Sequence, residues 1–122
     1  MGAPIAWLLE VMIMPGQLET LQALMEEIAA STHAEPGALR YEWLTGDDDR
    51  IVHLHEQYAD SAATLAHLDT FGERFAGRFL AVVDPTRLTV TGRPSDEVKA
   101  ALSGFGPTFL RPLGGFVRKA SV

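Results

Sequence analysis

The chain has 122 residues and a mass of 13.3 kDa, which suits one domain with a hydrophobic core, and we expect no second catalytic domain in it. Hydrophobic residues make up 47% of the sequence and charged residues 21%, as in folded globular proteins. A net charge of -6 leaves no basic surface for a phosphate backbone, so no nucleic-acid partner is expected. The sequence contains no cysteine, which excludes disulfides, thiolate metal sites and cysteine nucleophiles.

The apolar run over residues 5–14 predicts a first strand, which ends at Pro15-Gly16. This run is too short to span a bilayer, carries Glu10 and has no basic flank like that of a signal peptide. We therefore expect a cytoplasmic protein with no membrane partner. Over residues 17–32 apolar side chains recur at helical spacing, which predicts an amphipathic helix with one buried stripe.

Three further strands are predicted after this helix. Residues 38–45 and 51–58 are joined by a polar hairpin turn, and residues 87–92 alternate apolar with polar side chains. With a helical region between the third and fourth strands, the order is β-α-β-β-α-β. This order predicts the α+β class, with a ferredoxin-like antiparallel sheet.

The helical region between the third and fourth strands is predicted as two pieces. Asp60 is a favourable N-cap for a short helix through about Leu68. Thr70 and Glu73 have the spacing of a capping box, which predicts the start of a second helix. Pro85 is expected to end that second helix.

The first strand carries apolar side chains on both faces, interrupted only by Glu10. A strand that is apolar on both sides is buried on both sides, but two helical segments can cover only one face of the sheet. A large exposed apolar patch is unusual on a monomer, so a second subunit is the simplest cover. We therefore expect a homodimer.

Residues 94–122 follow the expected sheet domain of residues 1–93 as an appendage. Ser95 is a favourable N-cap for a short helix that stops at Gly104. The tail beyond it mixes apolar side chains with prolines and glycines, as in a segment laid over a surface. We expect this C-terminal helix and extended tail to pack on the dimer or over a pocket.

Five residues fit a known pattern: an acidic and an aromatic residue at the end of the third strand, a helix bearing a His, and a Thr-capped helix with a phenylalanine. They are Glu56, Tyr58, His67, Thr70 and Phe71. Pro36-Gly37 before the second strand, with Tyr41 and Glu42 inside it, is similar as well. On these residues the chain resembles the antibiotic biosynthesis monooxygenase family over residues 5–92.

The resemblance implies a dimeric α+β barrel that encloses one small apolar pocket in each subunit. Members of the family often oxygenate quinols or polycyclic phenols without metal or flavin, with molecular oxygen as co-substrate. An ionised phenol or hydroquinone can itself reduce dioxygen, so the protein needs only a proton acceptor, a dry cavity and correct orientation. Other members of the fold degrade haem or isomerise substrates, so the fold alone does not settle the function.

His67 is the leading candidate for a catalytic base or anchor, because an imidazole takes up a phenolic proton near neutral pH. The alternative is a histidine that caps a carbonyl or faces solvent. Glu56 is expected to orient His67 or Arg87, or else to form a salt bridge at the surface or the dimer interface. Tyr58 completes the expected catalytic set by hydrogen-bonding a substrate oxygen, or is a core residue.

Several more side chains are expected to bind the substrate by stacking on a planar ring or by lining the pocket. For the aromatic ones the alternative is again a place in the core. The expected substrate-binding residues are Trp43, Tyr41, His55, Phe71 and Phe75.

His53 and His55 share one face of their strand, a spacing that binds a divalent metal when a third ligand converges. No third ligand is evident, so no metal site is predicted. Haem-degrading relatives rely on an Asn in the first strand and on a Trp and a His in the second helical region. This chain contains no Asn, and Leu9, Ala66 and Ala76 stand at the places we match. No cofactor is therefore expected.

The leading hypothesis is a cofactor-independent monooxygenase that acts on a small aromatic, phenolic or quinol substrate. A second hypothesis is a dimer that binds or sequesters a reactive small molecule without turnover, as in a stress response. A third is a filled interior that binds no ligand. Haem degradation is placed below the first two hypotheses because the chain has no Asn.

Overall fold

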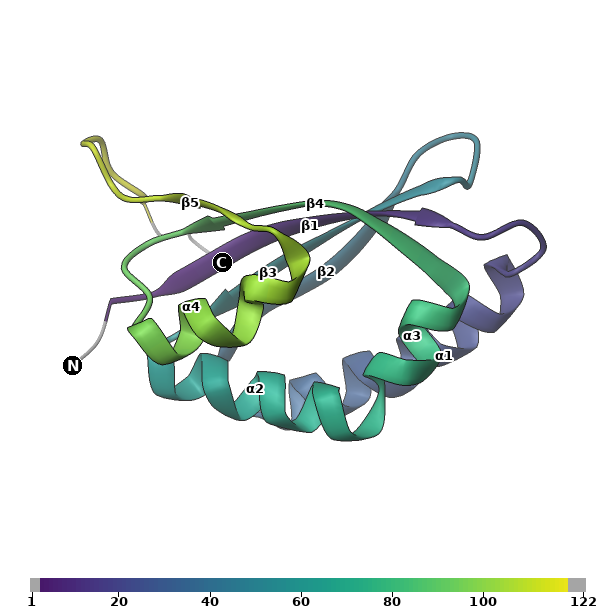
Figure 1. Cartoon of the computed structure of the whole chain (residues 1–122), viewed down its shortest axis with the longest axis horizontal. Helices are drawn as coiled ribbons and strands as arrows, with labels where there is room; N and C mark the ends of the chain where they lie inside the picture. The colour runs from purple at the N-terminus through teal and green to yellow at the C-terminus, as the bar shows by residue number, and fades with distance from the viewer. Residues whose placement is uncertain (1–2, 119–122) are drawn as a thin grey trace.

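The structure is a computed structural model that describes residues 3–118. Its elements in chain order are β1 (Ile5–Ile13), α1 (Leu18–His33), β2 (Ala38–Thr45), β3 (Ile51–Tyr58), α2 (Ser61–Arg74), α3 (Ala76–Val82), β4 (Val83–Thr91), α4 (Asp96–Leu102), the 3-10 turn η1 (Ser103–Phe105) and β5 (Thr108–Leu110). The strands form one open sheet in the order β2-β3-β1-β4-β5 (Figure 1). The predicted α+β class and ferredoxin-like arrangement are confirmed.

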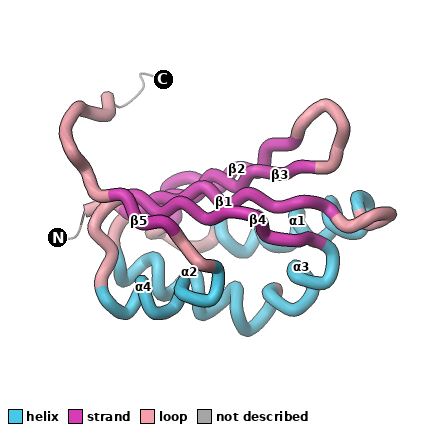
Figure 2. Tube along the Cα trace, turned by 45° about the horizontal axis from the view of Figure 1, so that its top comes forward, coloured by secondary structure: helices cyan, strands magenta, loops and turns pink. Residues whose placement is uncertain are grey.

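The helices all lie on one side of the sheet, as the two views in Figures 1 and 2 show. The hydrophobic core fills the layer between the sheet and the helices. Strand β1 runs through the middle of the sheet, between β3 and β4. Along β1 the side chains of Trp7, Leu9 and Val11 point into this layer and are buried. Within residues 3–118, no helix is long and apolar enough to cross a membrane.

The opposite face of β1 carries Ala6, Leu8 and Met12, which are only half-buried. No helix of the described chain covers this face (Figure 2). The sequence predicts a strand that is apolar on both sides and helices that cover only one side of the sheet. The arrangement of the single chain agrees with this expectation. We call this uncovered side, lined by alternate residues of the strands, the open face.

The predicted break between two helices at Thr70 is wrong, because α2 runs without interruption through it. Thr64, His67 and Phe71 recur at helical spacing and all pack toward the core, so the buried stripe continues past the expected capping box. The helix ends at Arg74. The next residue, Phe75, has a non-helical backbone and a buried ring. The predicted N-cap is present, since the Asp60 side chain accepts a hydrogen bond from the backbone N–H of Ala63 at 2.8 Å.

The predicted start of the fourth strand at residue 87 is too late, because β4 begins at Val83 and contains Pro85. Proline has no N–H to donate, but β5 pairs with β4 at residues 89–91, so within the described part of the chain Pro85 faces no partner strand on that side. The register between β1 and β4 also shifts beside this proline. The sheet is mixed rather than fully antiparallel, because the tail adds β5 as a parallel strand.

A close contact between the turn before β2 and the first turn of α2 sets the spacing of these elements. A Cβ atom at Gly37 would lie 2.4 Å from the Cβ of Ala63. The carbonyl of Gly37 also accepts a hydrogen bond from the backbone N–H of Ala59 at 2.9 Å. Glycine is therefore required at this position because α2 packs directly against the backbone.

The substitution Gly37→Ala should lower the free energy of unfolding by about 1–3 kcal/mol, because the added methyl group overpacks the contact with Ala63. Gly72→Ala is the matched control, since it lies within α2 with open space around a new Cβ. The control should raise stability by about 0.5–1 kcal/mol. Urea denaturation of both variants measures the changes, and equal stability of the two variants would contradict the close-contact argument.

Candidate active site

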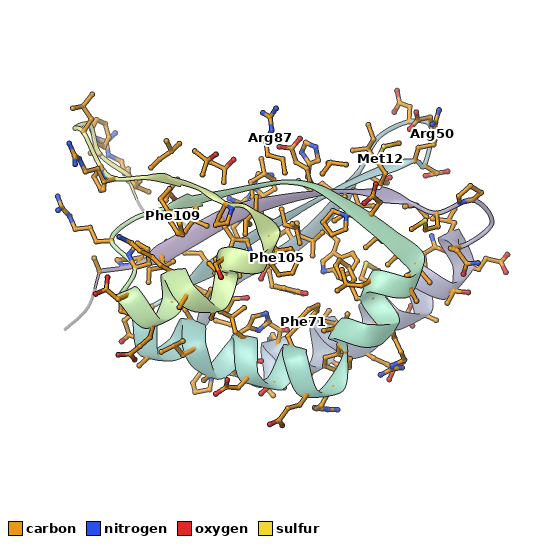
Figure 3. All side chains as sticks on the ribbon, viewed as in Figure 1. Met12, Arg50, Phe71, Arg87, Phe105 and Phe109 are labelled. Atoms are coloured by element: carbon orange, nitrogen blue, oxygen red, sulfur yellow. The ribbon has the colours of Figure 1, made fainter. Side chains whose placement is uncertain are left out.

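A small cavity lies between the sheet and the helices. Its walls are mostly apolar, with leucines from β1, β3, α2, β4 and α4 and five aromatic side chains: Trp7, Tyr41, Phe71, Phe79 and Phe105. Phe71 and Phe105, labelled in Figure 3, come from α2 and from η1. Glu56 and His67 supply the polar part of the wall. The cavity has a volume of about 50 Å³, enough for a few water molecules.

The polar wall belongs to a buried cluster centred on the imidazole of His67. The Nδ1 atom lies 3.1 Å and 3.3 Å from the two carboxylate oxygens of Glu35. The Nε2 atom lies 3.5 Å from Oε1 of Glu56. The Tyr58 hydroxyl donates a hydrogen bond of 2.6 Å to the same Oε1 atom. One ring therefore connects two carboxyl groups through its opposite nitrogens.

Aromatic contacts hold the imidazole in this orientation. The Tyr58 ring centroid lies 4.8 Å from that of His67 at an angle of 31°. Phe71 stacks on the imidazole at 6.1 Å, and Tyr41 contacts it at 5.7 Å. Packing on several sides leaves the ring little freedom to rotate, so its nitrogens stay directed at the two carboxyl groups.

Burial dominates the electrostatics of the cluster. It raises the pKa of Glu56 from 4.5 to about 7, against the opposing effect of the hydrogen bond from Tyr58. It lowers the pKa of His67 from 6.5 to about 4. Ionised carboxylates beside the ring would favour the imidazolium, but burial also raises the pKa of Glu35, so both carboxyl groups are harder to ionise. We therefore assign a neutral His67 at pH 7.

Three short-range features of the sequence bring the cluster together. Glu56 lies on the inner face of β3, which alternates buried and half-buried residues along its length. His67 is carried on the buried stripe of α2, whose start is capped by Asp60. Glu35 lies in the turn after α1, where its N–H bonds to Thr32 and its carbonyl accepts from Ala38. The close contact at Gly37 brings that turn against α2.

The structure brings together five of the residues singled out in the sequence, which are His67, Glu56, Tyr58, Tyr41 and Phe71. His67 does not face solvent and Glu56 does not form a surface salt bridge, because they are only 3% and 5% exposed and contact each other. Tyr58 is a core residue that reaches the cavity only through Glu56.

Three expected substrate-binding residues lie away from the cavity wall. His55 lies on the open face of the sheet, between Leu8 on β1 and Glu42 on β2. Trp43 packs edge-on against Phe79 at 5.8 Å, and its buried Nε1 atom has no hydrogen-bond partner among residues 3–118. The Phe75 ring is buried at the junction of α2 and α3.

One residue of the site, Glu35, is not among those predicted from the sequence. It lies just before the Pro36-Gly37 turn, and its contact is with a residue 32 positions later. Phe105 belongs to the C-terminal segment that the sequence analysis expects on the dimer or over a pocket, and at the end of η1 its side chain lines the cavity. The available signal for Glu35 was an acidic residue two positions before a turn glycine that a helix approaches closely.

The geometry offers no metal centre within residues 3–118, where no three His, Asp or Glu side chains converge on one point. Glu35 and Glu56 approach opposite nitrogens of His67, so the three groups surround the ring and do not share a vacant centre. On the open face, His53 lies 3.6 Å from Glu10, and among the residues that the structure describes it forms no larger metal-binding cluster with His55.

The substitution Glu56→Gln tests the ionisation of the buried carboxyl group. The stability that protonated Glu56 contributes is fully present below pH 4.5 and is lost as the pH rises through about 7, because the unfolded chain ionises first. Gln does not ionise. The lowered pKa of His67 adds the same pH dependence to the free energy of unfolding of both proteins, so it cancels in their difference. The free energy of unfolding of the variant minus that of the wild type should therefore rise by about 3 kcal/mol from pH 4.5 to 7. Urea denaturation across this range measures it, and a constant difference would contradict the raised pKa.

Comparison with solved structures places the fold among known ones. MupZ from Pseudomonas fluorescens superposes with a TM-score of 0.86 at 23% sequence identity, covering 99% of each chain. Protein SO0527 from Shewanella oneidensis gives 0.63 at 24% identity, covering 74% of this chain and 90% of its own. SnoaB from Streptomyces nogalater, described as a cofactor-independent oxygenase, gives 0.64 at 17% identity, covering 78% and 98%.

Sequence comparison is more specific about the family. No match was found among curated protein sequences. The sequence profile of the antibiotic biosynthesis monooxygenases matches residues 4–71, which is more than half of the chain and includes Glu35, Glu56 and His67. The resemblance noted in the sequence is thereby confirmed, and the chain belongs to the antibiotic biosynthesis monooxygenase family.

Proposed function

We propose that the protein is a cofactor-independent monooxygenase that acts on a small aromatic, phenolic or quinol substrate. The observation that carries this proposal is the position of Glu56, a carboxyl group with a pKa of about 7 in the wall of a mostly apolar, aromatic cavity. A base is most effective when its pKa lies near the working pH, because it is then both available and strong enough to take a proton. Membership of a monooxygenase family supports the same chemistry.

The proposed role of His67 differs from that of a simple base. A pKa of about 4 makes its imidazole a weaker proton acceptor than Glu56 at neutral pH. We therefore assign proton abstraction to Glu56, with His67 as its partner behind it and Tyr58 as the donor that orients its carboxylate. The aromatic walls supply the stacking surfaces for a planar substrate.

The reaction balances without an external reductant. The methylene group of an anthrone-type substrate reacts with one molecule of dioxygen to give a carbonyl group and one molecule of water, and the substrate carbon supplies all the electrons that reduce the oxygen. A hydroquinone reacts with one molecule of dioxygen to give a hydroxyquinone and one molecule of water. In both cases the protein ionises the substrate, excludes water and holds the anion, and the anion passes its electrons to oxygen.

Substrate entry requires the cavity to enlarge. A cavity of about 150 Å³ is enough to hold a benzene ring, whereas this one measures about 50 Å³. Phe105 is the wall residue with the greatest freedom to move, since it is 37% exposed and lies between Gly104 and Gly106. We assign the opening motion to this side chain.

Oxygen uptake with a panel of hydroquinones and anthrones should exceed the uncatalysed rate. Glu56→Gln and His67→Ala should each lower the catalysed rate by about 10²- to 10⁴-fold, because each removes a proton-transfer group. His33→Ala, at an exposed histidine of α1, is the matched control and should keep full activity. An oxygen electrode measures the rates. No acceleration with any member of the panel would count against the proposal, and saturable quenching of tryptophan fluorescence without oxygen uptake would favour binding without turnover.

We also propose that the open face forms the interface of a homodimer. Leu44 and Leu110 add exposed apolar surface to that formed by Ala6, Leu8 and Met12. The one acidic residue of β1 on this face, Glu10, lies 3.6 Å from His53 and 3.8 Å from Arg87, which lowers the cost of burying it. Arg87 projects from the side of the sheet away from the helices (Figure 3).

Sedimentation at micromolar concentration should give twice the chain mass of 13.3 kDa. Leu8→Glu places a charge at the centre of the open face and should yield monomers, because an unpaired buried charge costs several kcal/mol (about 3–5). Leu80→Glu, on the exposed side of α3, is the matched control and should remain dimeric. A stable single copy for the unmodified chain would refute the dimer.

A further inference from the structure

The imidazole of His67 joins the cavity to the protein surface. Its Nε2 atom lies 3.5 Å from Glu56, whose side chain is 5% exposed, and its Nδ1 atom lies 3.1 Å from Glu35, whose side chain is 20% exposed. Glu56 and His67 line the cavity, whereas Glu35 stands behind the ring. The three side chains therefore form a line from the substrate side of the ring toward solvent.

The neighbouring phenols do not compete for the proton. Tyr58 donates its hydroxyl hydrogen to Glu56, and Tyr41 packs against the imidazole. Burial, reinforced by the nearby carboxyl group of Glu56, raises the pKa of both tyrosines far above its ordinary value of 10. Both phenols stay protonated near neutral pH, so the carboxyl groups and the imidazole are the groups that exchange protons.

A neutral imidazole carries one N–H and one free lone pair, so it can accept a proton at one nitrogen while releasing one at the other. With Nδ1–H donated to Glu35, the Nε2 lone pair faces Glu56. Concerted transfer avoids a lasting imidazolium ion, which burial disfavours. The separation of 3.5 Å on the Glu56 side is long for a hydrogen bond, as is common in active sites without substrate.

We propose that Glu35 is the outer end of a proton relay from Glu56 through His67, which stores the substrate proton outside the cavity while the substrate anion reacts with dioxygen. This inference rests on the proposed oxygenation. Glu56 takes the proton from the substrate and passes it to Nε2 of His67. The Nδ1 proton then moves to the Glu35 carboxylate 3.1 Å away, where partial burial raises the pKa and so favours the protonated form.

The relay runs in reverse once oxygen has reacted. The substrate carbanion and dioxygen form a C–O bond and a peroxide anion, which takes the stored proton back to become a hydroperoxide. Loss of the remaining C–H proton and cleavage of the O–O bond then give the carbonyl group and water. The whole cycle consumes no net proton, so His67 returns to its starting tautomer.

Glu35→Gln separates the relay from a merely structural role. Its amide oxygen still accepts the hydrogen bond from Nδ1–H but cannot take up a proton. We expect kcat to fall about 10²-fold with the best substrate of the panel. KM should be unchanged because Glu35 does not line the cavity. Glu35→Asp keeps a carboxylate and should recover part of the loss. Equal kcat values for the wild type and the Gln variant would overturn the relay.

Glu27→Gln is the matched control, since it removes an exposed carboxylate that pairs with Arg78 and should leave kcat unchanged. A second readout needs no turnover. Nitrogen NMR at pH 7 should show the His67 ring neutral and protonated at Nδ1 in the wild type and in Glu35→Gln. A cationic ring, or one protonated at Nε2, would overturn the relay even where oxygen is consumed. No oxygen uptake by the wild type would remove the oxygenase proposal and the relay together, whereas uptake with equal rates would remove the relay alone.

Discussion

The contact of one buried imidazole with two carboxyl groups is the interaction on which the rest of this site depends. Desolvation makes each of the three groups resist ionisation, and an unpaired charge here would cost several kcal/mol. The fold meets this constraint by packing Tyr58, Phe71 and Tyr41 around the ring and by hydrogen-bonding Glu56. An apolar interior disfavours ionised carboxylates, and here it holds Glu56, whose pKa is raised to about 7.

The central strand β1 ties this interior to the other side of the molecule. Trp7 and Leu9 line the cavity, while Leu8 and Glu10 between and beside them face the open side of the sheet. Alternation along a single strand therefore places the cavity and the proposed dimer contact on opposite sides of one sheet. A partner subunit would stiffen the wall against which a substrate stacks.

Most of the fold could be predicted from the sequence, because each strand and each helix has a clear hydrophobic period. The errors lie where local patterns compete with packing. Thr70 and Glu73 have capping-box spacing, but the buried stripe of α2 continues past them. Pro85 looks like a stop, but an unpaired edge accepts it within β4. The residues of the site were predictable where a family pattern marked them, as at Glu56 and His67, and Glu35 was not, because its contact joins elements distant in sequence.

The wall contributed by Phe105 lies outside residues 4–71, whereas the acid–base groups lie inside them. The residues that set the pKa values of the site and the segment that closes the cavity at Phe105 are thus separate stretches of the chain. Changes in the length or bulk of the segment after α4 can alter which molecules fit the cavity without disturbing the ionisation of Glu56, His67 and Glu35. Selectivity and reactivity can therefore diverge independently among proteins built on this plan.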